Sequence, residues 1–177
     1  TFSFLILSVF LIKNKKDFFT TVFSFFILVF FLNVFEKTNT ADYHSPYQNV
    51  SVQYFNNNHA PMQIKSNNIW LQIPLNLSEE FYIKKNKNWY DLYSLPYKIK
   101  NFKSKQTLIV GSGVGNDVAA SLRDSSAKID AVEIDPLVAD LGIKFHPEKP
   151  YLNDRVNLTI NDARNFIKET KKKYDLI

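Results

Sequence analysis

Two uncharged, largely apolar runs open the chain. Residues 1–12 and 18–35 carry no charged side chain, and residues 13–17 (KNKKD) separate them. As a helix, the second run rises about 27 Å, close to the roughly 30 Å hydrocarbon core of a bilayer. The pattern predicts two transmembrane helices over residues 1–35, the first truncated, joined by a tight turn. The alternatives are a signal peptide, which the missing small-residue cleavage pattern disfavours, and a buried helical hairpin.

A period of two replaces this pattern after a polar linker, residues 36–44. In residues 50–54 (VSVQY), apolar and polar positions alternate as in a half-buried strand. Two further short apolar segments predict a return strand and a third strand, at residues 62–65 and 69–73. We therefore predict a small antiparallel β module within residues 45–105, which ends in a basic and aromatic connection to the next region.

From residue 106 to 177, apolar runs of strand length alternate with helical patterns. The predicted strands begin at Thr107, Ile129, Val156 and Tyr174. Asp135, followed by Pro136, and Asp162 each suit the N-cap of an intervening helix. Alternating β and α units with right-handed crossovers predict a doubly wound parallel sheet whose ligand cleft lies at the carboxyl ends of the strands. The same rule places the Tyr174 strand beside the strand that contains Leu108.

The stretch that carries candidate chemistry is residues 107–135 (TLIVGSGVGNDVAASLRDSSAKIDAVEID). Its first strand ends in a loop with glycines at positions 111, 113 and 115, which lets backbone approach a ligand closely before a helix begins. Glu133 ends the second strand about 20 residues beyond Gly113, a spacing that suits a carboxylate bound to ribose hydroxyls. Together the loop and the acid predict a nucleotide-like ligand.

The spacing of the glycines separates two classes of ligand. Dinucleotide-binding loops require a third glycine where this chain has Asn116, whereas its third glycine is Gly115. The tighter spacing resembles class I S-adenosylmethionine-dependent enzymes, whose ligand has no pyrophosphate. We therefore expect S-adenosylmethionine or its decarboxylated form, bound as a substrate in a Rossmann-like fold.

Composition indicates which metal ions, nucleic acids or lipids the chain could bind. The chain has 177 residues, a net charge of +5, no cysteine and three histidines without ligand spacing, so we predict no disulfide and no metal site. Lysines interleaved with aromatic residues make residues 84–105 basic. Such a pattern also occurs in nucleic-acid contacts and near anionic lipid, but a solvated face is the preferred interpretation.

Several further motifs follow in a specific order. They are residues 110–117 (VGSGVGND), 130–136 (DAVEIDP), 146–151 (HPEKPY), 154–156 (DRV), 162–164 (DAR) and 174–177 (YDLI). In order and spacing they resemble the spermidine synthase family, and more narrowly its membrane-anchored, synthase-like bacterial branch. The resemblance covers residues 45–177 and is strongest from residue 107 onward.

The resemblance implies a set of adenosyl-ligand residues: Gly111, Ser112, Gly113, Gly115, Asp117, Glu133, Ile134, Asp162 and Ala163. In this set the glycine loop would hold the methionine-derived moiety, Glu133 would bind the ribose, and Ile134 would flank the adenine. Asp162 and Ala163 would meet the adenine edge. Two structural alternatives stay open, because Glu133 also suits a plain strand-end acid and Asp162 a helix cap.

One departure from the family pattern concerns Val114. Polyamine synthases carry an acid at that place, which helps to hold the amine of the aminopropyl donor. Asp117 lies close by in sequence and is the candidate substitute. The catalytic aspartate of the family follows the strand that begins at Tyr174, so the resemblance places it after Ile177, and this chain, interpreted as a fragment, is expected to be inactive.

These observations predict a membrane-anchored transferase that moves an aminopropyl group to a small-molecule amine. The alternatives are a small-molecule methyltransferase and a non-catalytic membrane protein that binds an adenosyl ligand. The expected location is a multi-pass position in a bacterial inner membrane with the catalytic domain in the cytoplasm, although the lysines of residues 13–17 favour the opposite orientation. Association into a homo-oligomer is left open.

Overall fold

The computed structural model describes residues 14–35, 39–78, 87–99, 103–124 and 126–177, and the chain divides into two compact units, residues 1–39 and 40–177. Helix α2 (Lys15–Phe35) belongs to the first unit. The tight turn predicted at residues 13–17 is wrong in its second half, since Lys15 already begins the helix.

Helix α2 confirms the predicted helix at residues 18–35 but gives no support to its predicted role as a membrane span. Several of its phenylalanine side chains are exposed, among them Phe19, Phe23 and Phe26. Over the part of the chain that the structure describes, no helix combines the length and the apolar character that crossing a bilayer requires. Residues 1–12, the other predicted span, lie outside the described residues.

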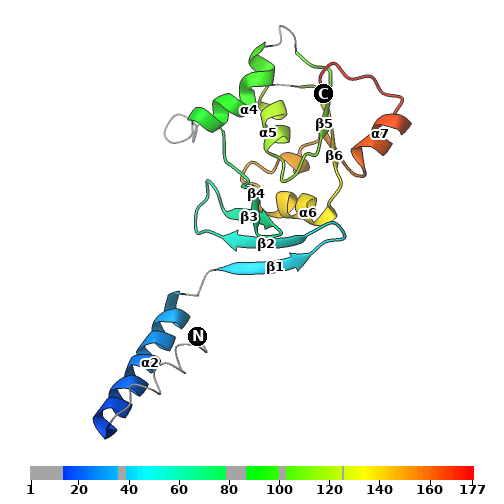
Figure 1. Cartoon of the computed structure of the whole chain (residues 1–177). Helices are drawn as coiled ribbons and strands as arrows, with labels where there is room; N and C mark the ends of the chain where they lie inside the picture. Colours follow the sequence, from blue (N-terminus) through cyan, green and yellow to red (C-terminus); the bar gives the residue numbers. More distant parts are fainter. Residues whose placement is uncertain (1–13, 36–38, 79–86, 100–102, 125) are drawn as a thin grey trace. The chain divides into compact units, whose positions relative to one another are not determined.

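The second unit begins with an antiparallel sheet in the order β1-β2-β3-β4 (Figure 1). Its strands are β1 (Thr40–His44), β2 (Asn49–Tyr54), β3 (Met62–Ser66) and β4 (Ile69–Gln72). The three predicted strands are therefore confirmed. The prediction that residues 40–44 belong to a linker is wrong, because they form strand β1. Its side chains alternate only between exposed and half-buried positions, so its sequence lacks a clear apolar face.

The basic and aromatic connection forms a helix, α4 (Lys87–Ile99). Lys98 donates to Asp91 at 2.7 Å, and Lys87 pairs with the same carboxylate. All three side chains are substantially exposed, as the solvated-face interpretation expects.

The parallel sheet has the order β5-β6-β7. Its strands and helices are β5 (Gln106–Val110), α5 (Asn116–Arg123), β6 (Lys128–Glu133), α6 (Pro136–Phe145), the 3-10 helix η1 (Pro150–Leu152), β7 (Val156–Ile160) and α7 (Ala163–Glu169). Beyond α7, the Leu176 carbonyl accepts from Leu108 N at 2.9 Å, in a parallel bridge beside β5. This contact confirms the predicted neighbour of β5 and makes β5 the point where the strand order reverses.

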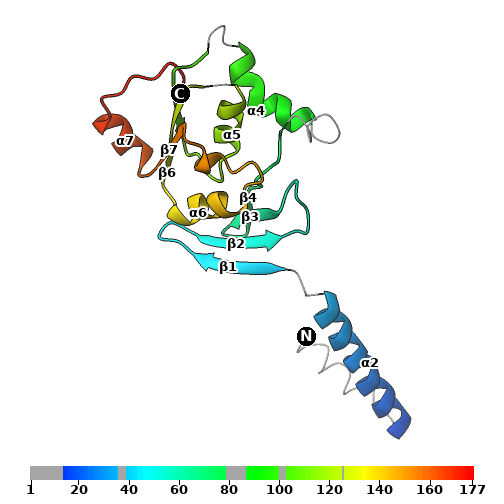
Figure 2. The same cartoon turned by 180° about the vertical axis from the view of Figure 1, so that it is seen from behind.

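Helix α6 lies between the two sheets in both views of the molecule (Figures 1 and 2). The apolar core there joins one residue of the glycine loop to β2, β3 and α6; its buried members are Val50, Val52, Met62, Ile64, Val114, Val138 and Leu141. Burying aliphatic side chains in this way stabilises folding by roughly 1.5–3 kcal/mol each. The antiparallel sheet therefore serves as the packing surface for the glycine loop.

Candidate functional site

The carboxyl edge of the parallel sheet brings the predicted ligand residues together. The glycine loop follows β5, Glu133 and Ile134 close β6, and Asp162 with Ala163 follows β7. The register pairs Val110 with Val132 and Glu133 with Ile160, so the three strand ends lie side by side. In open α/β sheets a ligand binds at such an edge, where the strand order reverses.

Two glycines of the loop meet different requirements. Gly111, with φ of +67°, faces open space, since a Cβ there would meet no atom within 4 Å. Gly115, with φ of +102°, packs so closely that a Cβ would lie 2.9 Å from Pro150 and 3.2 Å from Tyr151. Gly111 therefore leaves room for a ligand, whereas Gly115 allows the loop to pack on η1.

Glu133 holds the glycine loop through two backbone contacts. It is only 7% exposed; Oε2 accepts from Gly113 N at 2.7 Å and Oε1 accepts from Asp135 N at 2.9 Å. The strand-end acid thus has a structural role. Each carboxylate oxygen keeps a further lone pair, so the side chain can also accept from a ligand hydroxyl. Ribose binding by Glu133 stays a prediction.

Asp135 connects this site to the antiparallel sheet. Its Oδ1 accepts from Leu137 N at 3.0 Å, which confirms the predicted N-cap of α6. Its Oδ2 accepts from Ser45 Oγ at 2.7 Å and from Gln48 Nε2 at 2.8 Å. The carboxylate is 1% exposed and fully engaged by protein donors.

Tyr151 supports the loop from beneath and was not predicted as a site residue. Its hydroxyl lies 2.9 Å from Ser112 Oγ and 2.7 Å from the Gly113 carbonyl. Burial raises the pKa of Tyr151 far above its usual value, so the phenol stays a donor. The Ser112 hydroxyl accordingly faces the protein interior rather than the open side of the loop.

The remaining predicted residues surround an exposed apolar strip. Val110, Ile134 and Ile160, at the ends of the three strands, are 44%, 38% and 46% exposed, which suits contact with a flat ring. Asp162 is exposed and caps α7, accepting from Arg164 N at 2.7 Å, so the predicted N-cap is confirmed. Contact of Asp162 and Ala163 with adenine stays a prediction.

Val114 and Asp117 clarify the departure from the family pattern. Val114 is fully buried in the core, so its side chain has no access to a ligand. Asp117 is exposed in the first turn of α5, yet desolvation by surrounding protein raises its pKa. Its charge in turn contributes to the raised pKa of Tyr93, whose main cause is burial.

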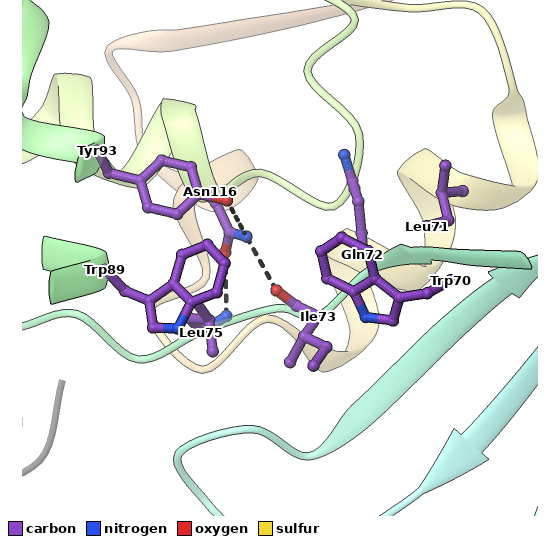
Figure 3. Close-up of a pocket in the computed structure, with 8 residues that line it drawn as sticks. All are labelled: Trp70, Leu71, Gln72, Ile73, Leu75, Trp89, Tyr93 and Asn116. Atoms are coloured by element: carbon purple, nitrogen blue, oxygen red, sulfur yellow. Dashed lines mark hydrogen bonds between the residues drawn. The ribbon is translucent and has the colours of Figure 1, made fainter.

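A cavity of about 180 Å³ adjoins the loop, and we name it the aromatic pocket (Figure 3). It is lined by Trp70, Leu71, Gln72, Ile73, Leu75, Trp89, Tyr93 and Asn116. Gln72 Oε1 accepts from Val114 N at 2.8 Å, and the Trp89 and Tyr93 rings stack with centroids 6.3 Å apart. Aromatic faces attract organic cations. Sequence analysis missed this pocket because its walls come from β4, α4 and α5.

Gly113, with φ of +56°, also lies against the wall of this pocket. A Cβ on Gly113 would lie 2.3 Å from the Gln72 amide. Gln72, at the end of β4, therefore contacts the glycine loop and also lines the aromatic pocket. Within the described residues, side chains of the metal-ligating types form no cluster of three or more.

Known proteins resemble the chain over this region. Residues 91–177 match the family described as Spermine/spermidine synthase domain. A polyamine aminopropyltransferase of Buchnera aphidicola is 42% identical over 77 residues, which are 41% of this chain and 27% of that protein. One from Alkaliphilus metalliredigens is 40% identical over 76 residues, with the same coverage. The chain thus spans about a quarter of the length of these relatives.

Solved structures show the same fold. A spermidine synthase in complex with the transition-state analogue AdoDATO and the spermidine synthase of Thermotoga maritima each align with a TM-score of 0.60. Both are 18% identical, and the alignment covers 79% of this chain and 46% of theirs. Residues 91–177 are therefore similar to the spermine/spermidine synthase family, and the second unit shares the fold of the solved spermidine synthases.

Proposed function

We propose that this chain supplies the donor site and part of the acceptor site of an aminopropyltransferase. The donor would be decarboxylated S-adenosylmethionine, and the acceptor a small polyamine-type amine. Three findings support the proposal: the family match, the named relatives, and the solved relative whose bound analogue is AdoDATO.

The observation that carries the proposal is the shared wall between loop and pocket. Gln72 bonds to the glycine loop and lines the aromatic pocket, and Asn116 begins α5 and lines it as well. A donor held at the loop and an amine held in the pocket would therefore occupy adjoining sites that Gln72 and Asn116 border. Holding two reactants in contact is the main requirement of a group transfer.

The proposed transfer is a displacement at carbon. The acceptor nitrogen attacks the propyl carbon next to the donor's sulfonium; the new N–C bond forms as the C–S bond breaks, and methylthioadenosine leaves. The nitrogen then loses a proton to a carboxylate base. In this chain, Gly111 leaves space for the donor, and Glu133 holds the loop and the ribose. The Trp and Tyr rings hold the protonated, non-reacting amine of the acceptor, while its neutral nitrogen attacks.

Asp117 is the residue on which donor choice depends. With Val114 buried, Asp117 is the acid nearest in sequence that can pair with the donor's amine. An Asp117→Asn variant should bind decarboxylated S-adenosylmethionine about tenfold more weakly, because it loses a charge-assisted hydrogen bond. Methylthioadenosine, which lacks that amine, is the matched ligand and should bind equally well to both proteins.

Methyl transfer is the second candidate, and buried Val114 is the observation that favours it. Calorimetry on the 177-residue chain separates the two functions. Aminopropyl transfer predicts tighter binding of decarboxylated S-adenosylmethionine than of S-adenosylmethionine, and the reverse order supports methyl transfer. Binding of NAD without any adenosyl-sulfonium binding would contradict both.

The location and further partners stay predictions. Attachment to a bacterial inner membrane, a cytoplasmic catalytic domain and a homo-oligomer come from the sequence alone. Carbonate washing tests the first: the chain should remain in the membrane pellet, and a variant without residues 1–39 should not. Recovery of the whole chain in the supernatant would contradict membrane attachment.

A further inference from the structure

Asn116 closes the glycine loop, and its hydrogen-bonding capacity is completely used. The amide Nδ2 donates to the Ile73 carbonyl at 2.9 Å and to the Tyr93 hydroxyl at 3.1 Å. The Oδ1 atom accepts from Leu75 N at 3.0 Å and lies 3.2 Å from His146 Nε2. Two donors and two lone pairs are all that an amide offers. Figure 3 shows the contacts to the pocket walls.

His146 is oriented so that it can only donate to this amide. The ring is fully buried, and Nδ1 accepts from Glu148 N at 3.1 Å, which places the proton on Nε2. Burial, together with the charges of Arg123 and Lys149, lowers the pKa of His146 to about 3. The ring is therefore neutral at physiological pH and presents Nε2–H to Asn116 Oδ1.

The direction of the Asn116 amide determines whether the pocket walls are joined. A rotation by 180° would point Nδ2 at the Leu75 N–H and Oδ1 at the Ile73 carbonyl, and both contacts would become repulsive. In the observed orientation the amide ties the end of β4 to Tyr93 on α4. These two segments form facing sides of the aromatic pocket.

We propose that His146 is a positioning residue for amine binding, which acts with the Leu75 N–H and the Ile73 carbonyl to fix the orientation of Asn116 and so the spacing of the pocket walls. The inference rests on the proposed function, in that the aromatic pocket is taken as the acceptor site. His146 itself touches no ligand in this arrangement. Its loss should weaken amine binding and leave adenosyl binding unchanged.

Two amide substitutions at position 146 form a matched pair. In His146→Gln, the amide nitrogen takes the place of Nε2 and can still donate to Asn116. In His146→Asn, the shorter amide reaches only the position of Nδ1, so the contact with Asn116 is lost. The two variants differ by one methylene, and general destabilisation by loss of the ring is common to both.

The pocket contains its own probe, because the chain has two tryptophans and both Trp70 and Trp89 line it. Tryptophan emission of the 177-residue chain is titrated with 1,4-diaminobutane and, separately, adenosyl affinity is measured with methylthioadenosine by calorimetry. We expect the diamine Kd to rise about three- to tenfold in His146→Asn and less than twofold in His146→Gln. Methylthioadenosine should bind all three proteins alike.

Equal diamine affinities in the two variants would overturn the proposal, as would a parallel loss of both ligands in His146→Asn. If the diamine does not bind the parent chain, the assigned acceptor site is wrong. The effect of His146 on the pocket walls is then tested in the ligand-free protein. Acrylamide should then quench the tryptophans more strongly in His146→Asn than in the parent or in His146→Gln. Identical quenching in all three would refute the positioning role.

Discussion

Strand β6 carries two buried carboxylates, three residues apart, that are held in opposite ways. Asp130, 2% exposed, accepts hydrogen bonds from side chains, among them Lys172 at 2.9 Å and Tyr174 at 3.0 Å. Glu133, 7% exposed, accepts only from backbone N–H groups in the contacts described above. The two acids share a strand, a charge type and a degree of burial, yet their partners differ.

This difference distinguishes a structural acid, Asp130, from Glu133, the acid that we propose to contact the ligand. Side-chain donors from residues 172–174 satisfy Asp130 and hold the segment beyond α7 against the sheet. Backbone donors at Glu133 fix the shape of a loop while leaving the carboxylate beside an open edge. For buried acids on a parallel sheet, the kind of donor is therefore more informative than burial itself.

The largest loss of ligand affinity is expected for Glu133→Gln. Whichever way the new amide lies, its NH₂ group faces either Gly113 N–H or Asp135 N–H, so one charge-assisted contact is replaced by repulsion. Loss of about 1.5–3 kcal/mol corresponds to roughly ten- to a hundredfold weaker binding of methylthioadenosine by calorimetry. Asp130→Asn is the matched control and should bind within about twofold of the parent. Unchanged affinity in folded Glu133→Gln would leave only the structural role.

Asp130→Asn should instead lower the free energy of unfolding by about 1–3 kcal/mol, because Lys172 and the other donors lose a buried anionic acceptor. Urea titration measures the loss. If the variant is as stable as the parent and binds ligand more weakly, the two acids have the roles opposite to those assigned here.

A Gly111→Ala substitution tests whether a ligand approaches the backbone of the glycine loop. The positive φ costs about 1 kcal/mol in stability, and the open space accepts the methyl group without a clash. A ligand that approaches the loop backbone would meet that methyl group, so methylthioadenosine affinity should fall more than stability does. Gly115→Ala is the control. It should lower stability more than methylthioadenosine affinity, since its Cβ would collide with Pro150.

The smallest expected effect is a pH dependence. Burial alone would raise the pKa of Asp130, but hydrogen bonds from Lys172, Asn157 and Tyr174 bring it below its usual value. Its contribution to stability is therefore complete above about pH 4, the ordinary Asp range, and is lost as pH falls through the lower folded pKa. The stability difference between parent and Asp130→Asn should be flat near neutrality and shrink below pH 4. A difference that grows with acid would contradict this sign.

Periodicity and the glycine loop predicted most of this fold, because local physics determines those features. Residues 50–54 alternate and form β2, and Asp135 before Pro136 caps α6, as expected. Strand β1 escaped prediction because Thr40 to His44 gain their order from pairing with β2 rather than from an apolar face of their own.

The candidate site was predictable only in part. Gly111 and Glu133 can be recognised from their spacing within one segment of the chain. Gln72 and Asn116 contact partners about 40 residues away, and no pattern within one segment encodes such a contact. Val114 could be recognised as a departure from the family, but its place in the core depends on a sheet that precedes it by some 50 residues.

The bonds of Asp135 to Ser45 and Gln48 have a kinetic consequence. They join the turn before β2 to the start of α6, so the antiparallel sheet cannot detach without exposing a buried carboxylate. We therefore expect opening of the two sheets to be coupled, so that amide protons of β2 and β6 exchange with solvent in part through a shared event. An adenosyl ligand held at Glu133 would then slow hydrogen exchange in β2, a strand whose residues lie outside the predicted ligand site.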